Sequence, residues 1–184
     1  MLSFDKHYTK WLAASLGVKT LPYEIVRKND NRAVTTAYPF IVKPSRLGSS
    51  IGVSVVREAS ELDYALDVAV EFDEVVLIEP FIAGVKEYNL AGFSARGEIT
   101  YSIVEEPQKA EFLDFEKKYL DFSRSGKVAH AEVNDTLVAQ LRDAFCKIYT
   151  PLFEGALIRC DFFEIDGVVY LNEVNPIPGS MANY

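Results

Sequence analysis

The sequence predicts an α+β protein, because helical and strand-like patterns alternate along the chain and several strands look like hairpin partners. Apolar residues recur at helical spacing over residues 3–16, 60–72 and 135–150, and short runs rich in β-branched and aromatic residues lie between them. Arg96-Gly97 and Asp166-Gly167 each separate two such runs, as tight turns between antiparallel strands do. Helices mixed with antiparallel strands define the α+β class.

Two helices and four strands are expected in the first half of the chain. Ser3 can cap the first helix and Gly17 can end it. Ser60, with Asp63 three residues later, resembles the capping pattern at the start of the second helix. The segments that are typical of strands cover residues 22–27, 38–43, 53–56 and 75–79.

The second half is expected to contain two hairpins and one helix. Asn134 or Asp135 is a suitable N-cap for a helix that reaches about Thr150. The hairpin strands are expected at residues 86–95 and 98–104, and at 156–165 and 168–174.

Two further segments indicate how the chain is organised. Residues 106–128 are polar, charged and aromatic without a clear period, and loops of this length in a compact protein are often functional. Pro80–Gly84 interrupts the regular pattern and is the expected hinge. We therefore expect two lobes, residues 1–83 and 84–184.

Composition excludes several classes of protein. The 184 residues are 49% hydrophobic, which is enough to build a core, and the net charge of −8 without a basic run argues against a nucleic-acid partner. Two cysteines and two histidines argue against a disulfide framework, a zinc site or a histidine-based triad. Because no apolar run is long enough for a membrane span or signal peptide, we expect no membrane partner and a cytoplasmic location.

The first candidate site is the loop that follows Lys43. Glycines at 48 and 52 flank Ser49 and Ser50, so backbone N–H groups and hydroxyls can approach anionic oxygens closely. Lys43, at the end of a strand, adds a positive charge that suits phosphate. An ordinary surface turn explains the loop equally well.

The second candidate site lies on the last two expected strands. Arg159 and Asp161 are two residues apart on one strand, as are Glu173 and Asn175 on the next, so all four can share one face of a hairpin. Their oxygens suit Mg²⁺, and an arginine beside them can stabilise developing negative charge. Cross-strand ion pairs on a solvated hairpin are the alternative.

Two weaker candidates complete the set. The segment from Glu79 to Glu87 could offer backbone groups to a purine, although a strand end and a connector explain it better. Lys118 and Tyr119 could reach a phosphate or a substrate from the long polar segment, where a solvated charged loop is the simpler interpretation.

Taken together and in order, these residues resemble the ATP-grasp superfamily and, within it, the D-alanine–D-alanine ligases. The resemblance also includes Asp5-Lys6 near the start and the run from Asn172 to Gly179 near the end. It involves nearly the whole chain, and the combination is far more specific than any single motif. It implies an ATP-grasp fold with two α+β lobes and the nucleotide between them.

The resemblance implies a role for each matching residue. ATP would be bound by Lys6, Lys43 and Ser50 at the phosphates, by Glu79 with the Phe81 and Ile82 backbone at adenine, by Glu87 at ribose and by Lys118 at the γ-phosphate. The residues implied in catalysis are Ser49 and Tyr119, which would orient the first D-alanine, and Arg159 with the Gly179 N–H, which would stabilise the oxyanion. Two Mg²⁺ ions, with Mn²⁺ as the alternative, would be bound by Asp161, Glu173 and Asn175.

The implied reaction is the ATP-dependent joining of two D-alanine molecules for peptidoglycan precursor synthesis. ATP phosphorylates the carboxylate of the first D-alanine, and the amine of the second attacks the acylphosphate. ATP and D-alanine are therefore the expected small-molecule partners, and a homodimer is the expected assembly of the full-length enzyme.

Two departures from the family pattern affect this expectation. Family members carry an N-terminal domain before the matching segment and continue past it, often with a serine where this chain ends in Tyr184. We therefore expect an inactive fragment. Two other functions remain open, namely another ATP-grasp carboxylate–amine ligase and a nucleotide-binding module without catalysis. Tyr119 favours the dipeptide ligase, because relatives that form depsipeptides tend to have a histidine in this loop.

Overall fold

The chain forms two compact units. The computed structural model describes residues 5–48, 50–95, 97–107 and 131–178. The first unit comprises Met1–Trp11 and Thr20–Gly84, and the second comprises Leu12–Lys19 and Val85–Tyr184. This division falls one residue after the boundary expected at 83, and it assigns residues 12–19 to the second unit. The assignment of the two lobes as domains stays a prediction.

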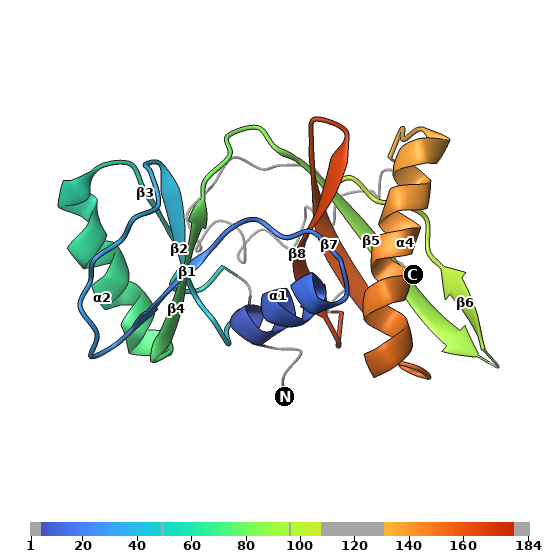
Figure 1. Ribbon diagram of the computed structural model, residues 1–184, viewed down its shortest axis with the longest axis horizontal. Coiled ribbons are helices and arrows are strands. Elements are labelled where there is room, and N and C mark those ends of the chain that lie inside the picture. Colours follow the sequence, from blue (N-terminus) through green and yellow to red (C-terminus); the bar gives the residue numbers. More distant parts are fainter. Residues whose placement is uncertain (1–4, 49, 96, 108–130, 179–184) are drawn as a thin grey trace, which may run out of the picture. The chain divides into compact units, whose positions relative to one another are not determined.

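The first unit is built on a four-stranded antiparallel sheet (Figure 1). Helix α2, Leu62–Phe72, covers one face and buries Ala65, Leu66 and Ala69 against apolar strand residues, as its expected stripe predicts. In sheet order the strands are β1 (Glu24–Arg27), β4 (Val75–Pro80), β2 (Phe40–Pro44) and β3 (Ser54–Val56).

The cap expected for α2 is wrong. A short 3-10 turn, η2 (Ala59–Glu61), precedes the helix, and Glu61 is the N-cap without a side-chain hydrogen bond. The hydroxyl of Ser60 instead donates to Glu58 Oε1 at 2.5 Å. The capping pattern fails because a carboxylate two residues away takes the hydroxyl.

Helix α1 spans Lys6–Ser15 and directly follows Asp5. Asp5 Oδ1 accepts from the N–H groups of His7 at 3.0 Å and Tyr8 at 3.3 Å, which is the geometry of an N-cap. Ser3, the expected cap, lies outside the described residues. Gly17 adopts φ +70° just after the helix, so the expected end is confirmed.

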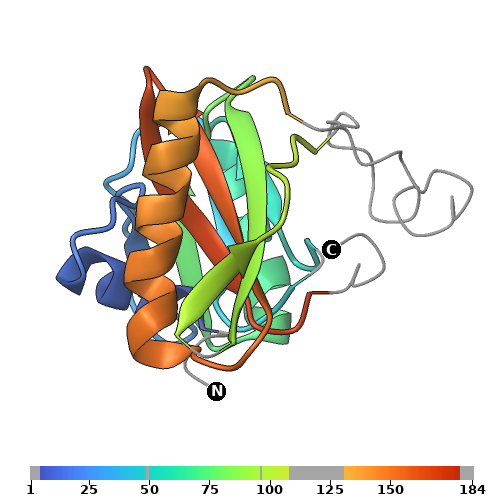
Figure 2. The ribbon, with the colours of Figure 1, turned by 90° about the vertical axis from the view of Figure 1, so that its right-hand side faces the viewer.

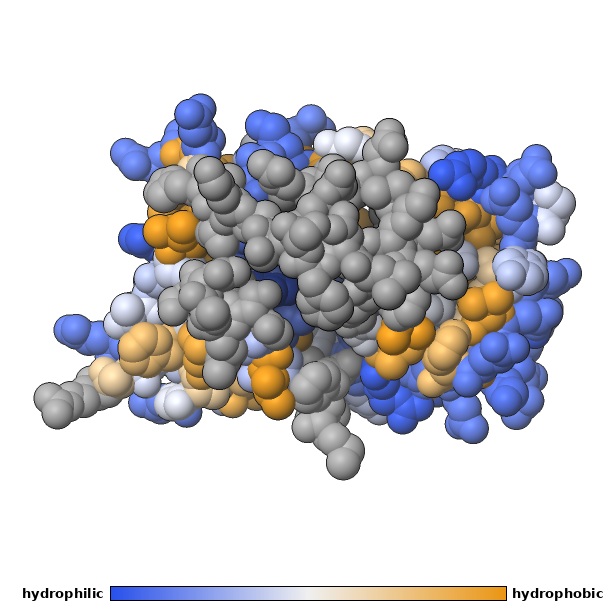
Figure 3. Space-filling view, turned by 180° about the vertical axis from the view of Figure 1, so that it is seen from behind, coloured by the Kyte–Doolittle hydropathy of each residue, from blue (hydrophilic) through white to orange (hydrophobic). Residues whose placement is uncertain are grey.

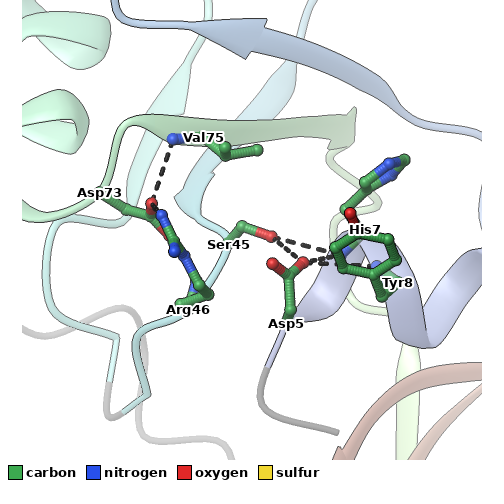
Figure 4. Close-up of polar contacts among 7 residues, drawn as sticks. All are labelled: Asp5, His7, Tyr8, Ser45, Arg46, Asp73 and Val75. Atoms are coloured by element: carbon green, nitrogen blue, oxygen red, sulfur yellow. Dashed lines mark hydrogen bonds and ion pairs between the residues drawn. The ribbon is translucent and has the colours of Figure 1, made fainter. Parts of the chain in front are cut away.

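Two buried carboxylates hold the start of the segment that follows β2 (Figure 4). Asp5 accepts a 2.7 Å hydrogen bond from Ser45 Oγ, which ties this segment to the start of α1. Asp73 accepts from Arg46 N at 2.7 Å and from Val75 N at 3.1 Å, and it also pairs with the Arg46 guanidinium. Burial raises the pKa of Asp73, but the hydrogen bonds from Arg46 and Val75 bring that pKa below its usual value.

The second unit contains another four-stranded antiparallel sheet, with α4 (Asp135–Leu152) across one face (Figure 2). Asn134 caps α4 by accepting from Leu137 N at 2.9 Å, as expected, and the helix runs two residues past Thr150. In sheet order the strands are β6 (Glu98–Tyr101), β5 (Lys86–Ala95), β7 (Ile158–Ile165) and β8 (Val168–Asn175). The buried helix residues are Leu137, Leu141, Ala144, Phe145, Ile148 and Tyr149.

A β-bulge in β8 decides which of its side chains are buried. Asp161 lies opposite Glu173, but the next residue of β7, Phe162, lies opposite Leu171, so Asn172 is an extra residue. Leu171 and Val174 are both buried in the core beneath α4, although they are three residues apart. Without the bulge, strict alternation would turn Glu173 into that core.

The outer surface of the first unit around α2 is mainly hydrophilic, as the right-hand edge of Figure 3 shows. Asp63, Asp67 and Glu71 are exposed on this helix. Within residues 5–48, 50–95, 97–107 and 131–178, no helix has both the length and the apolar character needed to cross a lipid bilayer.

Gly92→Ala is expected to destabilise the second unit. A Cβ at this position of β5 would lie 3.0 Å from Phe145 Cζ and 3.0 Å from the Thr100 carbonyl oxygen. Overpacking of this kind typically lowers the free energy of unfolding by about 1–3 kcal/mol, which urea denaturation would measure. Gly48→Ala is the control, because a Cβ there meets no atom within 4 Å. Equal stabilities for the two variants would contradict this packing.

Asp73→Asn is expected to lower the free energy of unfolding near neutral pH by about 1–3 kcal/mol, because a buried, charge-assisted set of hydrogen bonds is lost. The pKa of Asp73 is depressed in the folded state. Its stabilisation is therefore fully present above the unfolded-state pKa of about 3.9, and it is lost as the pH falls through the folded-state pKa. The gap between variant and wild type should close in acid.

Urea denaturation at several pH values would measure this gap. Asp63→Asn is the matched control, because Asp63 is 83% exposed and its ion pair with Arg32 is 3.7 Å long. Its effect should stay within about 0.5 kcal/mol. A gap for Asp73→Asn that is constant from acid to neutral pH would show that its charge contributes nothing.

Candidate functional site

A lysine–glutamate cluster lies on the face of the first sheet that points away from α2. Lys43 on β2 and Glu79 on β4 share this face, since Ile41 is the register partner of Glu79. One carboxylate oxygen of Glu79 pairs with Lys43 and the other with Lys10 from α1. The side chains of Lys10 and Glu79 are each 1% exposed, and that of Lys43 is 11% exposed.

The charge of Glu79 depends on its two lysines. Burial raises the pKa of its carboxyl, but Lys43 and then Lys10 lower that pKa, and the net result is a pKa below the usual value. The cluster therefore contains one carboxylate and two ammonium groups. Such a surplus of positive charge suits an anionic ligand.

The loop at residues 45–52 follows Lys43 in the sequence. Lys6 Nζ donates to the Leu47 carbonyl oxygen at 2.5 Å, so a second lysine is held at the loop. Ser50 and Gly52 adopt left-handed backbone conformations, with φ of 59° and 69°. A Cβ on Gly52 would also lie 2.8 Å from Phe72 Cδ2, so this position requires glycine.

The second cluster is on β7 and β8, on the sheet face opposite α4. Arg159 donates to both oxygens of Asp161, at 2.6 and 2.8 Å, and Asn175 Nδ2 donates to Asp161 Oδ2 at 2.9 Å. Glu173 is the register partner of Asp161. These four residues therefore share one face of the sheet, as expected. The bulge at Asn172 brings Glu173 to that face.

Asp161 is in an unusual electrostatic environment. It is 4% exposed, and its pKa is raised to about 6. Burial is the largest cause of this shift, Arg159 lowers the pKa, and the charges of Glu173 and Glu87 raise it. A carboxylate that is buried beside other carboxylates gains when a cation joins it. The donor set of this face therefore fits a hard metal ion.

The fit to a metal ion rests on oxygen atoms from Asp161, Glu173 and Asn175. Among the described residues there is no group of three or more histidine, cysteine, aspartate or glutamate side chains that could hold a metal ion. The set therefore consists of two carboxylates and an amide oxygen, and Mg²⁺ would need water and phosphate oxygens to complete its shell.

Two buried residues were missed by the sequence analysis. Lys10 carries no local signal, because its partner Glu79 is distant in sequence. Asn89 on β5 is the register partner of Asp161, and its Oδ1 is buried without a hydrogen-bond partner in the part of the chain that the structure describes. This acceptor faces the second cluster, which only the pairing of β5 with β7 reveals.

Other expected site residues lie at the ends of β4 and β5. The N–H of Phe81 donates to the Pro39 carbonyl oxygen at 3.0 Å, so that N–H has a partner within the chain. Ile82 follows it in the connection to β5. Glu87 lies opposite Phe163, on the same face as Asn89 and Asp161.

Within each unit, the structure brings expected residues together. The described residues of the first unit join Lys43 to Glu79, and Lys6 to the 45–52 loop. Those of the second unit join Arg159, Asp161 and Asn175 directly, with Glu173 beside them. Four expected site residues lie outside the described residues: Ser49, Lys118, Tyr119 and Gly179.

Two curated proteins with similar sequences carry the same name. A D-alanine–D-alanine ligase of Sulfurimonas denitrificans is 62% identical over the whole chain, and one of Wolinella succinogenes is 59% identical. In both comparisons the chain covers 53% of the relative, so it spans about half the length of the curated relatives that it matches.

A solved structure agrees with these relatives. The crystal structure of D-alanine–D-alanine ligase from Helicobacter pylori matches the whole chain with a TM-score of 0.84 and 48% identity, over 54% of that structure. A family model described as the D-ala D-ala ligase C-terminus matches residues 12–183. The α+β ATP-grasp fold expected from the sequence is confirmed, and the chain belongs to the family described as the D-ala D-ala ligase C-terminus.

Proposed function

We propose that this chain supplies the ATP-binding and metal-binding part of an enzyme that joins two D-alanine molecules at the expense of ATP. The observation that carries the proposal is the face of β7 and β8 on which Arg159, Asp161, Glu173 and Asn175 converge. The substrate is inferred from the names of the relatives. A role in peptidoglycan precursor synthesis follows from that substrate.

In this proposal the first unit binds the nucleotide. Lys6 and Lys43 hold phosphate oxygens, and the backbone of the 45–52 loop, with the hydroxyls of Ser49 and Ser50, surrounds them. The left-handed backbone at Ser50 and the hydrogen bonds from Ser45 to Asp5 and from Arg46 to Asp73 support this role, because the latter position the start of the loop. Glu79 and the backbone at Phe81 and Ile82 face adenine.

The second unit contributes the groups that offset negative charge on the reacting atoms. Asp161, Glu173 and Asn175 would hold Mg²⁺, or Mn²⁺, and the bound ions would offset charge on the transferring phosphoryl group. Glu87 accepts from the ribose hydroxyls. Arg159, with the Gly179 N–H, stabilises the oxyanion of the tetrahedral intermediate.

The reaction proceeds in two steps that need positioning more than covalent help from the protein. The carboxylate of the first D-alanine attacks the γ-phosphorus, and ADP leaves. The amine of the second D-alanine then attacks the acylphosphate carbon, and phosphate leaves with the formation of the amide bond. Ser49, Lys118 and Tyr119 are proposed to orient the reacting groups.

Nucleotide binding by this chain is the direct test. Titration with the non-hydrolysable analogue adenosine 5′-(β,γ-imido)triphosphate in a calorimeter is expected to show saturable binding that Mg²⁺ strengthens. Lys43→Met is expected to weaken this binding about tenfold or more, because a charge-assisted phosphate contact is lost. Lys28→Met is the control, since Lys28 is an exposed lysine in a turn of the same unit. Absence of binding by the unmodified chain would overturn the proposal.

Metal binding by the second cluster can be measured separately. Asp161→Asn and Glu173→Gln are each expected to weaken Mn²⁺ binding about tenfold or more in the presence of the analogue. Electron paramagnetic resonance measures the bound Mn²⁺. Asp166→Asn is the matched control, because it makes the same charge change in an exposed turn of the same hairpin and asparagine tolerates its φ of 51°. A metal site elsewhere would leave all three variants alike.

A further inference from the structure

Lys10 is a buried charged residue for which the proposed function provides no task. Its side chain is 1% exposed, and its ammonium group pairs with one oxygen of Glu79 while Lys43 pairs with the other. Its Nζ also lies 5.9 Å from the centre of the Tyr23 ring. Burying an ammonium group is costly, so a lysine in this position calls for an explanation.

The two lysines that share Glu79 differ in access to solvent. Lys43 retains 11% of its side-chain exposure, whereas Lys10 retains 1%. Only Lys43 can therefore extend to a ligand without a rearrangement of the core. Lys10 is buried and pairs with Glu79 as a counter-ion.

A partner exchange explains why both lysines are present. If Lys43 were the sole counter-ion of Glu79, its movement to a phosphate would leave a buried carboxylate unpaired. Removing one partner of a buried ion pair is strongly destabilising, so the phosphate would have to compete with Glu79 for Lys43. With Lys10 on the other oxygen, Glu79 keeps a partner throughout.

We propose that Lys10 is a positioning residue for nucleotide binding, which holds Glu79 in place so that Lys43 can exchange its ion pair for a phosphate oxygen. This inference rests on the proposed function. Lys10 does not touch the nucleotide, and it acts through Glu79. Its own place is fixed by α1, whose N-cap Asp5 is tied to Ser45 at the start of the 45–52 loop (Figure 4).

The alternative role for Lys10 is the stability of the fold alone. In that case its removal would destabilise the first unit without a specific effect on nucleotide affinity. The two roles differ in one respect. A positioning role through Glu79 disappears when Glu79 is neutral, since a buried amide needs no counter-ion.

A double-mutant cycle in this chain tests the inference. The four proteins are the wild type, Lys10→Met, Glu79→Gln and the double variant, and the readout is the dissociation constant of adenosine 5′-(β,γ-imido)triphosphate with Mg²⁺. Lys10→Met is expected to weaken binding about tenfold in the wild-type background and less than about twofold in the Glu79→Gln background. Lys28→Met is the control for the loss of a lysine.

Each outcome decides between the two roles. Equal losses in both backgrounds, or no loss in either, would overturn the inference and leave the proposed function intact. A wild-type chain that does not bind the analogue would overturn both. If Lys10→Met alone fails to fold, which thermal unfolding would show, Lys10→Gln takes its place in the same cycle, and the losses of affinity in the two backgrounds are compared in the same way.

Discussion

The candidate nucleotide site depends on one interaction, the pairing of the buried Glu79 carboxylate with both Lys10 and Lys43. It joins α1, β2 and β4 within the first unit, and it holds Lys43 beside the start of the 45–52 loop. A charge removed from water must be paired, so these three residues constrain one another more strictly than apolar neighbours would. The arrangement of the cluster is therefore a consequence of burial as much as of function.

The same constraint acts on the second unit in a different form. Asp161 is buried, and Arg159 and Asn175 supply the hydrogen bonds that offset its desolvation. Glu173 could not join them on a regular strand, because its position in the alternation belongs to the core face. The extra residue Asn172 shifts the alternation, so Val174 returns to the core and Glu173 faces Asp161. A local irregularity of the backbone thus brings the fourth residue to the site.

Sequence patterns predicted those parts of the structure that depend on near neighbours. The stripes of α2 and α4, the turn at Asp166-Gly167 and the common face of Arg159 and Asp161 follow from periodicity and turn chemistry. The N-cap predicted for α2 was wrong because the Glu58 carboxylate accepts the hydrogen bond of the Ser60 hydroxyl. The pairing of Lys10 with Glu79 and the facing of Asn89 towards Asp161 depend on contacts between distant segments, which periodicity does not encode. The bulge left one signal, since the apolar residues Leu171 and Val174 are spaced by three instead of two.

In each cluster, a group proposed to meet the ligand already has a partner of opposite charge. Lys43 is paired with Glu79, and Asp161 is paired with Arg159. Binding of ATP and a metal ion would therefore exchange one charged partner for another and would not bury a new charge. Such an exchange avoids most of the desolvation penalty, because these groups left water when the chain folded. It also requires that the residue that loses its partner, Glu79 or Arg159, is neutralised by another group. Lys10 meets that requirement for Glu79, and for Arg159 the developing oxyanion would meet it during the reaction.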